Sequence, residues 1–151
     1  MIRLKFLGLS SVMFVLFLSA CGAPATPAAT STPTGPQIVN VSMTTYGFKL
    51  TPDKIKAGEV KFVAKNDATD LIHEIFLVKT DLAIDKLPLG SDNISIDEES
   101  KALAKVGAAE DIEPGKSGEM TVTLEAGRYV YFCNKDNHYK LGMVGELTVA
   151  P

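Results

Sequence analysis

From Gln37 onward, apolar residues occur in short runs, and turn-forming residues separate the runs. Residues 59–65 alternate cleanly, with Val60 and Phe62 on one face, as in a strand that buries one face. Residues 75–78 are apolar throughout, as in a strand at the centre of a core. The predicted strands cover residues 38–44, 54–57, 59–65, 71–79, 120–124, 128–132 and 143–149. Short strands at regular spacing predict an all-β, Greek-key β-sandwich.

Residues 80–118 interrupt this pattern. Within them, residues 97–106 combine acidic residues at the start with good helix formers, which predicts one short helix inside a long excursion. Loops this long are uncommon in compact domains and are usually functional or specific to a family.

The first 20 residues have the pattern of an export signal. Arg3 and Lys5 precede an almost wholly apolar stretch, residues 6–18, which is shorter than the roughly 20 residues of a spanning helix. Residues 18–22, Leu-Ser-Ala-Cys-Gly, resemble a bacterial lipobox. The resemblance implies cleavage before Cys21, a lipid on its sulfur and attachment to a bilayer. An ordinary secretory signal and an uncleaved anchor are the alternatives.

A tether follows Cys21. Residues 22–36 contain only Gly, Ala, Pro, Thr and Ser, a composition that builds no core and favours extended, solvated backbone. A featureless spacer has the same composition. The expected organisation is a signal peptide at residues 1–20, a lipidated cysteine and tether at 21–36, and one folded domain at 37–151.

The charge of the chain excludes one class of partner. The net charge is −3, and residues 1–20 hold two basic residues and no acid, so the remainder has 15 − 2 = 13 basic and 18 acidic residues. A net charge of −5 argues against a nucleic-acid partner, which needs a basic face. We expect a monomer.

Cys133 calls for a chemical explanation. If Cys21 carries a lipid, Cys133 has no disulfide partner, which in an exported protein suggests a metal or redox role. Cys133, His138 and Met143 are spaced at 0, +5 and +10 in a loop between two predicted strands. Thiolate, imidazole and thioether together suit copper. His73, the one other histidine, begins a predicted strand and supplies a third strong donor, which gives the His₂Cys set with a weak Met of blue electron-transfer sites.

The residues around Cys133 also match a known signature. The matching positions are Gly127, Tyr129, Phe132, Cys133, His138, Gly142, Met143, Gly145, Leu147 and Val149. With them, residues 37–151 resemble the plastocyanin/azurin (cupredoxin) family of type 1, or blue, copper proteins, and among these the tethered bacterial lipoproteins similar to auracyanin and sulfocyanin. The resemblance implies one copper ion, Cu(I) or Cu(II), with His73, Cys133 and His138 as equatorial ligands and Met143 as the axial ligand.

Two departures from the family pattern concern the surroundings of the site. The family often has Asn after the first histidine, where it ties the two ligand loops together. Here Glu74 occupies that position, so Glu74 and Asn134 are the candidates for that outer role. Asp136 and Asn137 replace the Pro-Gly of many relatives, which predicts a more polar and more flexible loop.

The resemblance implies a non-enzymatic protein that shuttles single electrons between membrane-bound redox proteins. We expect it outside the cytoplasm, lipid-anchored to a bacterial membrane, in the periplasm or on the outer face of the cell membrane. A copper chaperone or buffer is the main alternative, although the chain has no Met-rich or His-rich tract. A copper enzyme needs an open coordination position, which Met143 would fill. A metal-free interaction module leaves Cys133 unexplained.

Overall fold

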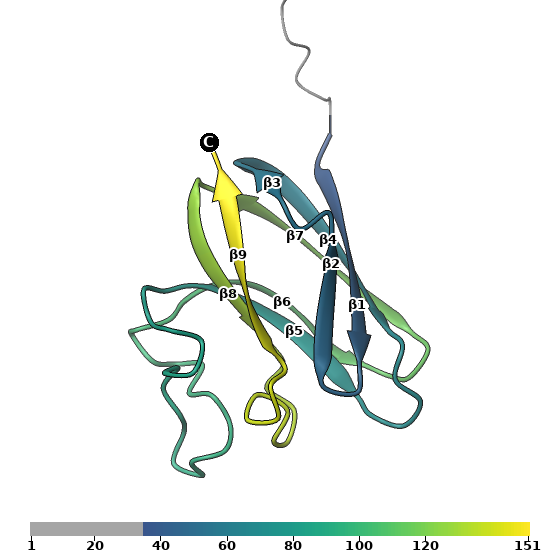
Figure 1. Ribbon diagram of the computed structural model, residues 1–151, viewed down its shortest axis with the longest axis vertical. Helices are drawn as coiled ribbons and strands as arrows, with labels where there is room; N and C mark the ends of the chain where they lie inside the picture. Colours follow the sequence, from purple (N-terminus) through teal and green to yellow (C-terminus); the bar gives the residue numbers. More distant parts are fainter. Residues whose placement is uncertain (1–34) are drawn as a thin grey trace, which may run out of the picture. The chain divides into compact units, whose positions relative to one another are not determined.

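The computed structural model describes residues 35–151, and the predicted signal peptide, the lipidation of Cys21 and the tether up to residue 34 lie outside them. Nine strands form the described domain (Figure 1). They are β1 Gln37–Thr44, β2 Gly47–Thr51, β3 Ile55–Lys56, β4 Gly58–Asn66, β5 His73–Lys79, β6 Ala104–Ile112, β7 Ser117–Leu124, β8 Gly127–Phe132 and β9 Val144–Ala150. All seven predicted strands are present.

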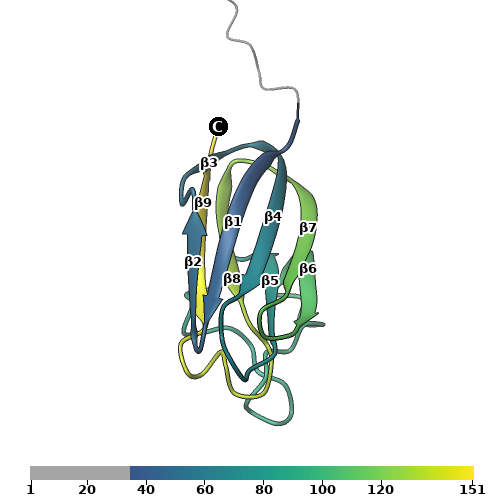
Figure 2. The same ribbon diagram turned by 90° about the vertical axis from the view of Figure 1, so that its right-hand side faces the viewer.

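The strands form two sheets that face each other, as the edge-on view in Figure 2 shows. One sheet has the order β2-β1-β4-β7 and the other β3-β9-β8-β5-β6. The pairs β1–β4 and β3–β9 are parallel, and the other pairs are antiparallel. The prediction of an all-β sandwich is therefore confirmed.

The main core fills the space between the sheets. Alternate residues of β1 (Val39, Val41 and Met43) and of β4 (Val60 and Phe62) are buried there. Their neighbours in sequence point outward, because successive side chains of a strand lie on opposite faces.

A second apolar cluster covers the outer face of the five-stranded sheet. Phe76 and Val78 of β5 and Phe132 of β8 pack there against Leu87 and Leu103, which come from the excursion after β5. β5 is thus buried on both faces, which explains its continuous apolar sequence. The excursion is part of the folded domain and contributes to its core.

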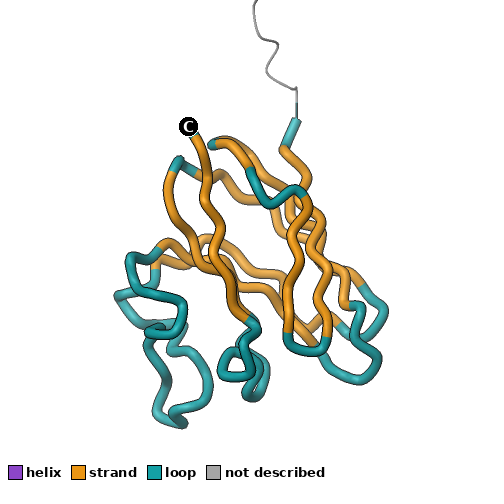
Figure 3. The backbone as a smooth tube through the Cα atoms, in the orientation of Figure 1, coloured by secondary structure: helices purple, strands orange, loops and turns teal. Residues whose placement is uncertain are grey.

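The predicted helix at 97–106 is wrong. Residues 35–151 contain strands, loops and turns, and no helix (Figure 3). Two single turns, closed by Ser100 N–H to the Asp97 carbonyl (3.1 Å) and Leu103 N–H to the Ser100 carbonyl (2.9 Å), lead into β6 at Ala104. Pairing of β6 with β5 overrides the local helix preference, which is worth only tenths of a kcal/mol per residue. Within the same range of residues, nothing qualifies as a membrane-crossing helix.

Candidate metal centre

Three of the four predicted donors converge at one end of the sandwich. The donor atoms of His73, Cys133 and His138 all lie within 4.8 Å of one another. Cys133 Sγ is 3.3 Å from His138 Nδ1 and 3.9 Å from His73 Nδ1. The exposed fractions are 0% for His73 and Cys133 and 3% for His138, so these groups meet away from bulk water.

His73 is positioned by the loop that precedes β5. The fully buried Asn66, at the end of β4, donates from Nδ2 to the carbonyls of Leu71 (2.7 Å) and Ile112 (2.8 Å). Its Oδ1 accepts from the Ala68 amide (3.0 Å). One amide side chain therefore fixes the loop on its way to His73 and joins it to the end of β6.

The other donors lie on the loop between β8 and β9, residues 133–143, which we call the ligand loop. Its ends are paired, because the Cys133 amide donates to the Met143 carbonyl (3.0 Å). The Met143 amide in turn donates to the His138 carbonyl (2.9 Å). Met143 is fully buried in the same core cluster as Cys133. Gly142 has a φ of +99°, a conformation that other residues rarely adopt, which accounts for a glycine at this turn.

Glu74 joins the ligand loop to β5. Its Oε1 accepts from the Asn134 amide (3.1 Å), and its Oε2 is 3.2 Å from Lys135 Nζ. Lys135 also pairs with Asp111 (2.6 Å), at the end of β6. Burial raises the pKa of Glu74, and the hydrogen bond and charge of Lys135 act in the opposite direction. Glu74, directly after His73 in β5, thus links the ligand loop to β5.

The Asn134 side chain does not link the ligand loop to β5, which is the role expected for Asn134 or Glu74. Its amide group contacts Ile96 and Glu98, both in the excursion. Only its backbone takes part in the link to Glu74.

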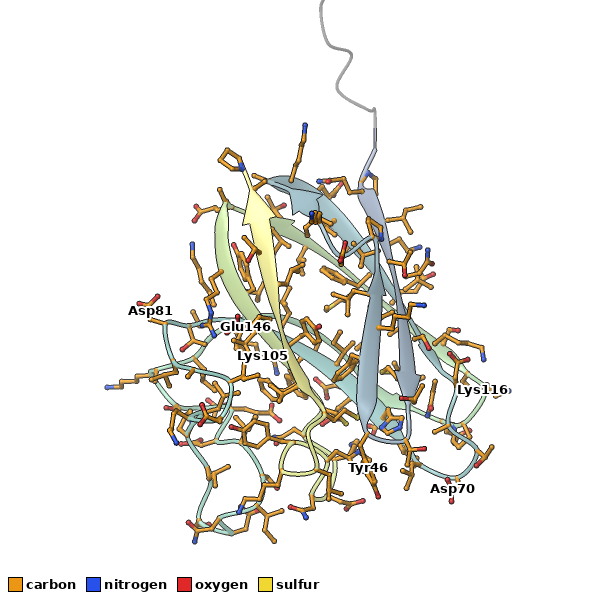
Figure 4. All side chains as sticks on the ribbon, in the orientation of Figure 1. Tyr46, Asp70, Asp81, Lys105, Lys116 and Glu146 are labelled. Carbon is orange, nitrogen blue, oxygen red and sulfur yellow. The ribbon has the colours of Figure 1, made fainter. Side chains whose placement is uncertain are left out.

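Tyr46, between β1 and β2, is a residue that sequence reasoning missed. Its ring packs edge-on against His138, with centroids 5.4 Å apart and an interplanar angle of 67°. Figure 4 shows Tyr46 and Asp70 at the same end of the domain as the ligand loop. No local signal marks Tyr46, because its contact depends on how the β1–β2 hairpin lies over the other sheet.

Burial controls the protonation of the donors. It raises the pKa of the Cys133 thiol to about 11 and lowers the pKa of His138. For His73, burial and then the neighbouring His138 lower the pKa, and the Thr44 backbone acts in the opposite direction. Neutral imidazoles are the form that binds metals, and a metal ion stabilises the thiolate over the thiol. The donors therefore fit a thiophilic cation such as copper.

Comparison with known proteins agrees with this chemistry. Residues 38–150 match the family described as copper binding proteins, plastocyanin/azurin family. The copper-resistant cuproprotein CopI of Pseudomonas aeruginosa is 54% identical over 41 residues. That match spans 26% of this chain and only 23% of CopI.

Solved structures show the same fold. Dithionite-reduced auracyanin from Roseiflexus castenholzii superposes with a TM-score of 0.60 at 22% identity, over 78% of this chain and 100% of that chain. Auracyanin A, a blue copper protein from Chloroflexus aurantiacus, gives 0.57 at 26% identity, over 76% and 99%. The chain belongs to the plastocyanin/azurin family of copper-binding proteins, the cupredoxins, and its cofactor is one copper ion.

Proposed function

We propose that this protein is a one-electron carrier whose copper ion is held by His73, Cys133, His138 and Met143. The observation that carries the proposal is the convergence of buried donors at one end of the sandwich. Copper in a His₂Cys site with a weak Met ligand changes between Cu(I) and Cu(II), and so accepts and releases single electrons.

The chain's own contribution is a fixed set of donors. One backbone hydrogen bond joins Cys133 to Met143, a second joins Met143 to His138, and Glu74 holds the ligand loop to β5. Because these contacts hold the ligand loop at both of its ends, the donors stay in place when the charge of the site changes. Movement that accompanies electron transfer is then small.

The edge at His138 is the expected point of electron exchange. His138 is the more exposed of the two histidines, and its loop lies at the end of the domain. Tyr46 and Leu141 beside it are 40% and 49% exposed. Apolar side chains exposed together favour contact with another protein. We infer that membrane-bound redox proteins dock here, with the protein held at the bilayer through a lipid on Cys21.

Copper handling, as a chaperone or a buffer, is the second candidate. The partial similarity to a copper-resistant cuproprotein favours it. The complete burial of Cys133 and Met143 favours retention of the metal over its transfer, because release requires the ligand loop to open. An enzymatic role finds no support in a site whose donors would all be ligands.

The test is the visible and EPR spectrum of residues 35–151 with one equivalent of Cu(II), a fragment that contains both core clusters. We expect an intense thiolate-to-copper band and a narrow parallel hyperfine splitting. Cys133→Ser should abolish both. Met143→Leu should change the hyperfine splitting, and Met120→Leu, in the core on β7, should leave it unchanged. An ordinary weak copper spectrum that Cys133→Ser does not alter would refute the ligand set.

A further inference from the structure

The excursion lies directly against the ligand loop. Residues 82–103, which we call the clamp segment, run beside it at the lower end of the view in Figure 1. A small hairpin forms the tip of the segment, with a bridge between Leu89 and Ile96 and a hydrogen bond from the Gly90 amide to the Ser95 carbonyl (2.9 Å). The segment therefore has defined structure where it meets the ligand loop.

Asn134 attaches the hairpin to the residue that follows Cys133. Its Oδ1 accepts from the Ile96 amide (2.6 Å), and its Nδ2 donates to the Ile96 carbonyl (3.1 Å). The Asn134 side chain thus both accepts from and donates to the backbone of Ile96, as a residue in a neighbouring strand would. Nδ2 also donates to Glu98 Oε1 (2.8 Å).

Tyr139 attaches the start of the clamp segment to the residue that follows His138. Its hydroxyl donates to the Ile84 carbonyl (2.7 Å) and accepts from the Leu87 amide (3.3 Å). The side chain is 9% exposed and belongs to the second apolar cluster. Each attachment therefore lies one residue from a proposed copper ligand.

Apolar packing between the two segments is incomplete. A half-open pocket of about 360 Å³ lies along their junction, lined by Ile84, Leu87 and Leu89 of the clamp segment, by Tyr139 and Gly142 of the ligand loop and by Val144 of β9. Where side chains do not fill the junction, the hydrogen bonds of Asn134 and Tyr139 supply a larger share of the attachment.

We propose that Asn134 and Tyr139 are positioning residues, which fasten the clamp segment to the ligand loop and so determine how often the loop opens and how fast copper leaves. This inference rests on the proposed ligand set for the part that concerns copper. According to this proposal, the excursion helps to retain the metal, because it holds the ligand loop closed.

The first arm of the test needs no metal. In the metal-free full chain, alkylation of Cys133 is followed by mass spectrometry of its peptide, so that Cys21 does not interfere. Because Cys133 is fully buried, labelling requires opening. We expect Asn134→Ala and Tyr139→Phe to accelerate labelling roughly tenfold, as expected for lost hydrogen bonds. Asn137→Ala, in the same loop, and Tyr131→Phe, on β8, are the matched controls and should change it less than about twofold.

Low urea concentrations distinguish local opening from a general loss of stability. Opening of the ligand loop exposes less surface than global unfolding, so the accelerated labelling should depend less steeply on urea than global unfolding does. Labelling that matches the controls, or that rises with urea as global unfolding does, would overturn the proposal.

The second arm measures the loss of copper to a chelator and the visible spectrum of the loaded full chain. We expect copper loss to accelerate in the same variants and in the same order as labelling, with a shifted thiolate-to-copper band. Copper loss at the wild-type rate from variants that label faster would overturn the copper-retaining role. If the wild-type chain shows no thiolate-to-copper band, the proposed ligand set fails, and the labelling arm still decides whether the clamp controls the loop.

Discussion

At the scale of single residues, the least expected feature is a buried carboxylate beside the metal centre. Glu74 has only 6% of its side chain exposed, yet it accepts from a backbone amide and pairs with Lys135. Leaving a buried hydrogen-bonding group without its partner costs about 1–3 kcal/mol. Glu74 therefore makes two separable interactions. A neutral side chain could also accept the hydrogen bond from the Asn134 amide, but only a charged carboxylate can form the ion pair with Lys135.

Substitutions at Glu74 should separate these two parts. We expect Glu74→Ala to lower the free energy of unfolding by about 1–3 kcal/mol, because the Asn134 amide loses its acceptor. Glu74→Gln keeps an oxygen in place and should cost less. Urea unfolding of the metal-free protein measures both, with Glu99→Ala, an exposed change in the excursion, as the control. Equal losses for the two Glu74 variants would show that the ion pair carries the whole effect.

The four proposed donors were all identified from the sequence, and the structure brings the donor atoms of three of them, His73, Cys133 and His138, together. Their prediction was possible because three of them share one short loop and His73 is the one remaining histidine. Asn66, Tyr46 and the Lys135–Asp111 pair were not predicted. Each acts through a contact with a segment distant in sequence, and that contact exists only once the sheets have formed.

At the scale of elements, the strands that pair along the main core were predictable and the irregular edges were not. β4 and β7 alternate between buried and exposed residues, so their sequences contain the signal. β2 has no fully buried residue. It also begins at Gly47 and ends at Thr51, before Pro52, and these turn-forming residues made the segment look like a loop in the sequence. β6 contains Ala104, Lys105, Gly107 and other weak strand formers, and pairing with β5 determines its conformation.

The hairpin tip of the clamp segment should respond to pH through Asp92. Hydrogen bonds from the Ile94 amide and from the hydroxyl and amide of Ser95 hold the pKa of Asp92 below its ordinary value of 3.8. The stabilisation is therefore complete above pH 3.8 and is lost as the pH falls below 3.8, through the lower folded-state pKa. The protection factor of the Ser95 amide, which is the intrinsic exchange rate divided by the rate measured by NMR at the same pH, should fall over that acidic range.

Asp92→Asn tests this assignment, since its side-chain oxygen accepts the same hydrogen bonds at every pH. In this variant the protection factor of the Ser95 amide should no longer depend on pH in the acidic range. If the dependence persists, another group controls the tip.

Gly145 of β9 illustrates how closely β9 and β8 approach each other. A Cβ at this position would overlap the ring of Tyr131, which itself packs edge-on against Phe48 at 5.3 Å. We expect Gly145→Ala to lower the free energy of unfolding by about 1–3 kcal/mol, as for other overpacked sites. Because the overlap is with one side chain, Tyr131→Leu should relieve part of that loss.

A double-mutant cycle on Gly145→Ala and Tyr131→Leu measures this coupling. The double variant should be more stable than the sum of the two single losses predicts. Additive losses would mean that the added methyl group disturbs the backbone of β9 itself.

At the scale of the whole molecule, electrostatics should govern the encounter with the proposed redox partner. All charges of the chain beyond residue 20 lie in the described domain, which carries a net charge of −5. Long-range attraction to cations and repulsion of anions follow, and both are screened by salt, with a Debye length of about 10 Å at 0.1 M.

Small oxidants of opposite charge should reveal this effect in the reduced, copper-loaded protein. Raising the ionic strength from about 0.01 M to about 0.15 M should slow oxidation by the cation tris(phenanthroline)cobalt(III) and accelerate oxidation by ferricyanide. Stopped-flow absorbance measures both rates. If both trends reverse, positive charges close to His138 dominate over the net charge, and if both oxidants respond in the same direction, charge does not govern the encounter.

The direction of β1 has a practical consequence. Thr44, at its end, lies near Tyr46 and hence near His138, whereas Gln37 begins the strand seven residues earlier, about 23 Å away at 3.3 Å per residue. A protein immobilised through the residues before β1 would present its copper to the solution and keep it far from the support. An electrode coated in this way should exchange electrons slowly with the protein, and attachment through the Tyr46 end should be the faster orientation for a sensor.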